Sequence, residues 1–333
     1  MANLRSKIID ERAFVARANA LAKGKVPFLF LVNFEKTAFF ICALEEAARY
    51  GVLYEVKGRT NAPTSPKRNG HSTALKLTPI DEQIYGKAFR VVQDSLYAGN
   101  SYLVNLTFPT PIETTASLEE LFHWSAAPYK LFFDGEFVLF SPECFVRIQD
   151  NCIFSYPMKG TIDAGVPNAA SVLLRDPKER AEHITIVDLI RNDLAMVASN
   201  VEVTKFRYID HIRTNRKNLL QVSSEIRGVL ESDWAANCGS LLLRLLPAGS
   251  ISGAPKAETV RIIQAAEQQE RGWFTGVFGL FDGKNLDSAV NIRFVERNGE
   301  QGLQFRSGGG ITIFSEEKKE YNEMLDKVYV PTF

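Results

Sequence analysis

The sequence has few of the residues that build structural zinc sites or disulfide frameworks. Its 333 residues include four cysteines (Cys42, Cys144, Cys152 and Cys238) without a CxxC pair, and four histidines without HxxxH or HExxH spacing. The pattern disfavours structural zinc and a disulfide scaffold, and it predicts buried free thiols in a reducing compartment.

The sequence also lacks an excess of one charge and a long apolar run. Lysine plus arginine and aspartate plus glutamate each number 39, so the formal net charge is zero, which disfavours nucleic acid or an anionic membrane as the main partner. The run Val26 to Val32 is too short to span a bilayer, and Asp10 and Glu11 precede it where a signal peptide has only basic residues. We therefore expect a buried strand there, no membrane partner and a cytoplasmic protein.

What is present is typical of a globular α+β protein, with 45% apolar and 23% charged residues. Helical spacing predicts helices over 4–23, 79–98, 118–126, 177–198, 235–246, from 255 onward and over 315–327. Strands are predicted over 26–34, 37–44, 102–108, 130–140 with a turn at 134–135, 145–148, 152–156, 273–281, 286–295 and 302–306. We predict one domain over residues 1–333, with the polar segment 58–72 as the only candidate linker.

One lysine stands out for its position between a strand and a turn. Lys159 lies between the apolar run Cys152-Ile153-Phe154 and a predicted Gly160-Thr161 turn, where a strand can deliver a side chain to the edge of a sheet. Most lysines at such turns are solvated surface residues. Glu143 precedes Lys159 by about one hairpin, so an acid and an amine could share a cleft.

Two pairs of glutamates have helical spacing. Glu179 and Glu182 lie three apart in the helix predicted over 177–198, and Glu320 and Glu323 repeat the spacing in the last helix. Each pair alone reads more simply as solvated surface, and Glu323 with Lys327 makes a favourable i,i+4 ion pair. Together the two pairs could supply the oxygen ligands that Mg²⁺ prefers.

A glycine run and an arginine suggest an anion site. Gly308-Gly309-Gly310 is predicted as a turn whose N–H groups could hold a carboxylate, and Arg293 at a strand end could clamp one through two hydrogen bonds. Neither GxGxxG nor GxxxxGK[ST] occurs, so nothing supports a nucleotide site. The residues alone predict a magnesium-dependent enzyme for a small polycarboxylate.

Six ordered blocks resemble the signature blocks of the chorismate-utilising enzymes. They are Ser141-Pro142-Glu143, Pro157-Met158-Lys159-Gly160-Thr161, the segment 182–193, the segment 247–256, Arg271-Gly272-Trp273-Phe274-Thr275-Gly276 and Gly308-Gly309-Gly310-Ile311. The resemblance covers residues 80–330, whereas residues 1–75 form a short, divergent N-terminal part. It implies two large, orthogonally packed antiparallel sheets flanked by helices, with Mg²⁺ and chorismate bound between them.

The resemblance also implies roles for individual residues. Glu182 and Glu323 match metal-ligating glutamates, and Glu179 and Glu320 match a second pair that acts partly through water. The residues that match positions contacting substrate are Arg293, Gly308, Gly309, Gly310 and nearby Lys327 for the ring carboxylate, with Thr161 and Ser250 lining the substrate. Glu143 matches the general acid.

Lys159 is typical of the aminodeoxychorismate synthases in this family, whereas anthranilate synthases carry alanine. The resemblance implies that a partly neutral Lys159 attacks C2 of chorismate and expels the C4 hydroxyl, which Glu143 protonates, before ammonia adds at C4. Leu103 stands where isochorismate-type enzymes place a lysine base, and Gln221 where many relatives have a histidine linked to pyruvate elimination. Leu103 disfavours an isochorismate or salicylate synthase, because leucine cannot activate water. Gln221 disfavours an aromatising reaction and favours a product that keeps its enolpyruvyl group.

The expected function is therefore that of component I of an aminodeoxychorismate synthase, with ammonia supplied by a separate glutaminase subunit. The alternatives are anthranilate synthase component I and a silent chorismate-binding subunit. The N-terminal block by which relatives bind tryptophan is not recognisable, so feedback inhibition is not expected.

Overall fold

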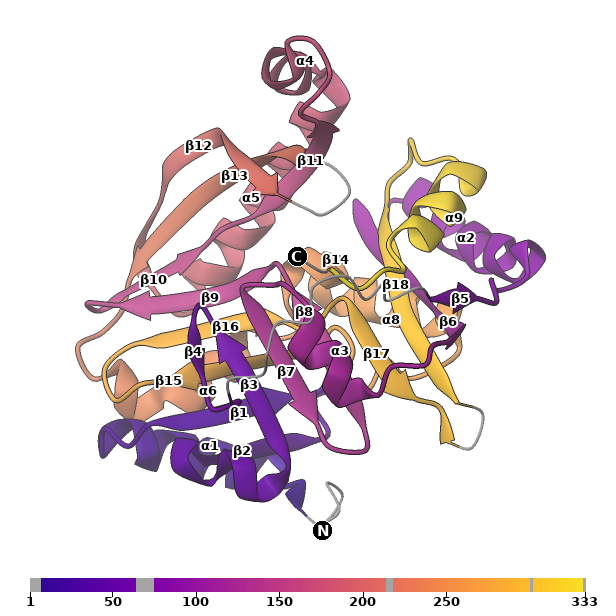
Figure 1. The fold of residues 1–333 in the computed structure, drawn as a ribbon. Coiled ribbons are helices and arrows are strands. Elements are labelled where there is room, and N and C mark those ends of the chain that lie inside the picture. Colours follow the sequence, from indigo (N-terminus) through magenta and orange to yellow (C-terminus); the bar gives the residue numbers. More distant parts are fainter. Residues whose placement is uncertain (1–6, 64–74, 214–217, 300–301, 332–333) are drawn as a thin grey trace.

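Two antiparallel sheets and their flanking helices form the described part of the chain, which covers residues 7–63, 75–213, 218–299 and 302–331 of this computed structural model (Figure 1). The helices are α1 (Glu11–Lys23), η2 (Leu44–Tyr50), α2 (Glu82–Tyr97), α3 (Leu118–Trp124), α4 (Ala169–Arg175), α5 (Pro177–Ala195), η3 (Trp234–Asn237), α6 (Cys238–Leu245), α7 (Gly249–Ser252), α8 (Lys256–Glu267) and α9 (Glu317–Asp326). The α+β prediction is confirmed.

The first sheet carries the strand with Lys159 at one edge. In spatial order its strands are β11 (Met158–Asp163), β13 (Asn218–Val229), β10 (Cys152–Ser155), β9 (Cys144–Gln149), β16 (Leu286–Val290), β15 (Val277–Phe281), β1 (Phe28–Val32) and β2 (Phe39–Ala43), and β12 (Ser199–Arg213) also pairs with β13. Helix α5 packs against β11, β12 and β13 (Figure 1). This packing places Glu182 of α5 next to Lys159.

The second sheet carries the glycine run in its interior. Its order is β14 (Gly253–Ala254), β6 (Leu103–Glu113), β18 (Leu303–Ile311), β17 (Phe294–Arg297), β8 (Phe137–Ser141), β7 (Tyr129–Phe133), β3 (Val52–Val56) and β4 (Arg59–Thr60), and β5 (Lys76–Leu77) pairs with β6. Helix α9 packs on β18, and α2 lies beside α9 (Figure 1).

Strand β1 shows how apolar side chains join the layers. Phe28, Phe30 and Val32 pack in the cluster that includes the helices, whereas Leu29 and Leu31 pack in the cluster between the sheets. Successive side chains of a strand point to opposite faces, so a strand buried on both faces is apolar throughout. The predicted buried strand over this run is confirmed, and no helix in the described ranges is long and apolar enough to cross a membrane.

Three local predictions were wrong. Gly160 and Thr161 are not a turn but lie inside β11, where the pairing with β13 shifts between Met158 and Thr161. Gly308-Gly309-Gly310 is likewise not a turn, because it pairs with residues 105–107 of β6. The strand predicted over 286–295 is interrupted at residues 291–293, where Arg293 adopts a positive φ of 54°.

The four cysteines are free in this structure, but only Cys42 and Cys238 are buried as predicted, because Cys144 and Cys152 are partly exposed. The predicted linker falls partly on β4, and its residues 64–72 lie outside the described residues.

Candidate active site

A cavity of about 190 Å³ brings together most of the predicted substrate residues. It lies between β18, α7 and the corner that follows β16. The predicted residues that line it are Glu143, Ser250, Arg293, Gly308, Gly309, Gly310 and Lys327. Residues from four of the six sequence blocks thus meet in one place, with Arg293 and Lys327 beside them.

Glu143 presents its carboxyl group to this cavity from the link between β8 and β9. The Ser141 hydroxyl accepts the Glu143 N–H at 3.1 Å, and the Ser250 hydroxyl donates a hydrogen bond to Glu143 Oε1. Burial raises the pKa of Glu143, and the opposing effects of Ser250 and the Lys327 ammonium do not cancel that rise. The carboxyl group therefore keeps its proton to higher pH than an ordinary glutamate, which suits a general acid.

The glycine run lets β18 lie close to strand β6 and to helix α9. A Cβ at Gly308 would lie 2.2 Å from the Leu106 carbonyl oxygen, and a Cβ at Gly309 would lie 3.5 Å from carboxylate oxygens of Glu320 and Glu323. Strand β17 pairs with β18 only as far as Arg306, so the glycines extend beyond that pairing into the cavity wall. A side chain at Gly308 would clash with the backbone of β6, whereas a Cβ at Gly309 would be in ordinary van der Waals contact with the carboxylates of α9.

Lys327 and Arg293 are held by the end of α9. Lys327 Nζ donates to the Gly308 carbonyl at 2.8 Å and pairs with Glu323 at 2.7 Å. Arg293 donates to the Lys327 carbonyl at 2.7 Å, and its guanidinium lies 4.7 Å from the Tyr329 ring centroid. Two cations therefore face one end of the cavity, as expected for a site that takes a carboxylate.

The predicted metal ligands form a second group beside the cavity. Lys159 Nζ lies 2.9 Å from Glu182 Oε2, and Glu179, Glu182 and Glu323 all act electrostatically on this ammonium. Burial alone lowers the pKa of Lys159, but these three carboxylates outweigh it and leave the pKa raised. Since Lys327 contacts both Glu323 and Gly308, it connects this group to the cavity.

The glutamates differ in how their surroundings affect protonation. Burial raises the pKa values of Glu179 and Glu320, which also feel neighbouring carboxylates. Burial also raises the pKa of Glu323, but Lys327 and Lys159 outweigh that effect and leave it lowered. Lysine ammonium groups thus act as counterions for these carboxylates.

Two observations test whether these residues suit a divalent cation. Glu179 Oε2 is buried without a hydrogen-bond partner, and a Cβ at Gly160 would lie only 2.6 Å from that oxygen. Among the residues that the structure describes, however, no three Asp, Glu, His or Cys side chains converge closely enough to ligate one ion. The donors fit Mg²⁺ by their chemistry, and they would have to draw together to enclose it.

Three residues singled out in the sequence lie elsewhere. Thr161 is exposed on β11 opposite Gln221 and does not line the cavity, so Gln221 neighbours the strand that carries Lys159. The Leu103 side chain packs against Gly310, where a Cβ would lie 2.9 Å from Leu103 Cδ1.

Several residues of the cavity wall were not predicted from the sequence. Asn105 and Thr107 of β6 line it together with Thr275 and Ser307. Thr275 belongs to the Arg-Gly-Trp block, which was recognised without a function, and its neighbour Arg271 is only 1% exposed. The signal for this region in the sequence is the block itself, which contains an arginine, whereas the burial of Arg271 is visible only in the structure.

Comparisons with known proteins agree with this geometry. The model of a family described as chorismate binding enzyme matches residues 29–332. The match thus includes residues 29–75, which carry none of the six recognised blocks. Strands β1 to β3 are integral to the two sheets, which explains why the similarity extends there.

Individual proteins point the same way. An uncharacterized PabA-like protein of Pasteurella multocida is 53% identical over 96% of this chain and 98% of its own length. Aminodeoxychorismate synthase component 1 of Salmonella typhimurium is 31% identical over 92% of this chain and 68% of its own. The crystal structure of anthranilate synthase component I from Streptococcus pneumoniae superposes with a TM-score of 0.70 at 21% identity, covering 90% of this chain and 79% of that one. By sequence, motif and fold, this chain belongs to the chorismate binding enzyme family.

Proposed function

We propose that the protein is component I of an aminodeoxychorismate synthase, which converts chorismate and ammonia to 4-amino-4-deoxychorismate. The observation that carries the proposal is Lys159, a partly buried amine on β11 among carboxylates beside the cavity. A site with alanine in place of Lys159 would lack a nucleophile at this position. The product would serve the formation of p-aminobenzoate for folate.

The chain's own residues divide the work as follows. Chorismate would place its ring carboxylate by Arg293, Lys327 and the glycine run, with the ring directed toward β11. The Lys159 amine attacks C2 while the C4 hydroxyl leaves, and protonated Glu143 gives that hydroxyl its proton, so that water departs. Ammonia then bonds to C4 and the bond from Lys159 to C2 breaks, which restores the free amine.

The amine must lose its proton before it attacks, and the contacts around Lys159 oppose this in the present structure, because the carboxylates raise its pKa. We propose Glu179, Glu182, Glu320 and Glu323 as the residues that hold Mg²⁺. A bound Mg²⁺ supplies positive charge that neutralises the carboxylates and attracts the substrate carboxylate.

The ammonia source is proposed to be a glutamine amidotransferase subunit. Three of the four free cysteines do not suit a glutaminase nucleophile, since Cys42 and Cys238 are buried and burial raises the pKa of Cys144 to about 12. The principal alternative reaction is that of anthranilate synthase component I, which would expel pyruvate and which both Lys159 and Gln221 disfavour.

The test is analysis of the products of the purified chain by mass spectrometry, with chorismate, Mg²⁺ and ammonium. We expect aminodeoxychorismate from the wild type, and loss of that activity or a shift to another product from Lys159→Ala. Lys178→Ala is the matched control, since Lys178 lies 4.0 Å from Glu182 but is more exposed. Anthranilate from the wild type would establish the alternative, and bound but unreacted chorismate would support a silent subunit.

A further inference from the structure

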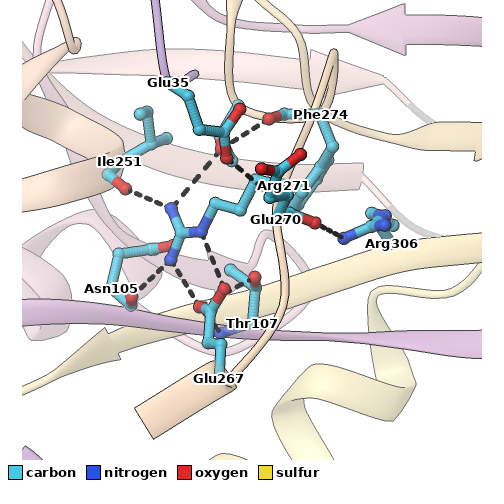
Figure 2. Close-up of polar contacts among 10 residues, drawn as sticks. Glu35, Asn105, Thr107, Ile251, Glu267, Glu270, Arg271, Phe274 and Arg306 are labelled. Carbon is cyan, nitrogen blue, oxygen red and sulfur yellow. Dashed lines mark hydrogen bonds and ion pairs between the residues drawn. The ribbon is translucent and has the colours of Figure 1, made fainter. Parts of the chain in front are cut away.

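A buried arginine, Arg271, contacts three segments of the cavity wall without lining the cavity itself. Its guanidinium lies between Glu267 of α8, Asn105 of β6 and Ile251 of α7 (Figure 2). Arg271 and Glu267 are 1% and 5% exposed, and they pair through Nη2 and Oε1 at 2.6 Å and through Nε and Oε2 at 3.0 Å. This planar, two-bond arrangement fixes the orientation of the guanidinium.

The remaining N–H groups of Arg271 donate to residues that line the cavity. Nη2 donates to the Asn105 carbonyl at 2.7 Å, and Nη1 donates to the Ile251 carbonyl at 2.9 Å and to Thr275 Oγ1 at 3.4 Å. All five guanidinium donors are therefore engaged. No shorter or more flexible cation could make these five contacts from one position.

Glu267 extends the same connection to β6. Its Oε1 accepts hydrogen bonds from the Thr107 N–H at 2.9 Å and the Thr107 hydroxyl at 3.0 Å. Asn105 and Thr107 are the register partners of Gly310 and Gly308 on β18. The ion pair thus fixes the strand against which the glycine run is aligned.

The Ile251 contact leads to the general acid. Ile251 follows Ser250 in the four-residue helix α7, and the Ser250 hydroxyl donates to Glu143. A helix this short has little hydrogen bonding of its own to fix its position. Its place relative to β6 therefore depends on contacts such as that between Arg271 and the Ile251 carbonyl.

Arg271 is itself seated by the segment after β1. Its backbone N–H donates to Glu35 Oε1 at 2.8 Å (Figure 2). Its guanidinium also lies 4.6 Å from the Phe34 ring centroid. A neutral, purely apolar filling of this space would pack as well but could not bind two carbonyls and a hydroxyl at once.

We propose that the Arg271–Glu267 pair is a positioning unit that holds α7 and β6 in the arrangement in which Ser250 directs the Glu143 carboxyl group into the cavity. The proposal takes from the proposed function only the role of Glu143 as general acid, and it holds for any chorismate-consuming reaction at this site. Arg271 acts through Ser250, so its loss lowers kcat more than it raises KM.

The test measures chorismate consumption by Arg271→Lys, Ser250→Ala and the double variant, at a temperature where circular dichroism shows all to be folded. We expect Arg271→Lys to lower kcat about 100-fold, since misplacement by about 1 Å has effects of that size, with little change in KM. The double variant should lose no more than the more affected single variant, because both changes disturb one unit. Multiplicative losses, or an unchanged kcat, would overturn the proposal.

Two further variants keep the test decisive. Arg261→Lys, on the exposed side of α8 in an ion pair with Glu258 at 2.9 Å, is the matched control and should leave kcat unchanged. Glu267→Gln keeps the shape of the pair and serves if Arg271→Lys does not fold; it should show the same non-additivity with Ser250→Ala.

Amide hydrogen exchange of the free protein provides a readout that needs no turnover. We expect Arg271→Lys or Glu267→Gln to accelerate exchange in residues 249–252 and 105–107 but not in α4, which packs against β11, β13 and α5. If the wild type consumes no chorismate, the function is refuted, while unchanged exchange in those segments refutes the positioning role separately.

Discussion

Replacing Ser250 with alanine removes the hydroxyl that donates to the Glu143 carboxylate. A hydrogen bond to a charged group contributes about 1.5–3 kcal/mol to the charged form. Because about 1.4 kcal/mol corresponds to a factor of ten, the ratio of charged to protonated Glu143 at a fixed pH should fall about 10- to 100-fold in Ser250→Ala. Burial, which already raises the pKa of Glu143, remains in place and acts in the same direction.

The sign of the effect on activity follows from the role of Glu143. A general acid is active when protonated, so kcat falls as the pH rises through its pKa. Loss of the Ser250 hydrogen bond raises that pKa further, so the alkaline limb of the kcat profile should move to higher pH, even if the maximal rate is lower.

The assay is the initial rate of chorismate consumption across a pH series, at saturating chorismate and Mg²⁺. Glu143→Gln should remove the limb altogether, and Ser252→Ala should leave it where it is in the wild type, because the Ser252 hydroxyl donates instead to the Ala248 carbonyl at 2.8 Å. A limb that stays in place or moves to lower pH in Ser250→Ala would show that Ser250 does not stabilise the carboxylate.

Two other predictions concern the carboxylate group and its supporting helix. Gly160→Ala should raise the Mg²⁺ concentration for half-maximal activity about tenfold, because the added Cβ would crowd Glu179 Oε2. Gly58→Ala is the control, since Gly58 has a similar positive φ but no atom within 4 Å of its Cβ, and it should leave that concentration unchanged. Equal effects of the two variants would mean that backbone strain alone is responsible. Burial, aided by the Arg207 charge, lowers the pKa of His183 from 6.5 to about 4, so protonation favours the unfolded chain. Urea unfolding should therefore show stability that is full above pH 6.5 and falls by about 3 kcal/mol toward pH 4, a loss absent from His183→Gln.

The sequence predicted best where local chemistry decides the structure. The pair Asp134-Gly135 marks the turn between β7 and β8, and Gly135 has the positive φ of 74° that such turns require. Pro177 begins α5, at a position where its missing N–H costs nothing. Both features depend on residues adjacent in the chain, and the face that Glu179 and Glu182 share follows from the helix period.

Predictions from the sequence were wrong where contacts between segments far apart in the chain determine the structure. Three consecutive glycines are locally typical of a turn, yet Gly308 to Gly310 form a strand because β6 pairs with them, and its backbone leaves no room for a side chain at Gly308. Thr161 was likewise predicted to line the substrate only because its block resembles that of the family. In the structure this residue is exposed and does not line the cavity. Register between strands separated by about 200 residues is a tertiary property that periodicity does not record.

The N-terminal strands bear on the site although no predicted site residue lies in them. Val32 at the end of β1 pairs with Val277, and a Cβ at Gly276 would lie 2.1 Å from the Val32 carbonyl oxygen. The segment just after β1 contacts the backbone N–H and the guanidinium of Arg271. Arg271 in turn binds the carbonyl of Ile251, and the adjacent Ser250 donates to Glu143. The segment after β1 is therefore linked to the Glu143 carboxyl group through only a few contacts. A part of the chain without recognisable motifs thus supports the residues that the motifs supply.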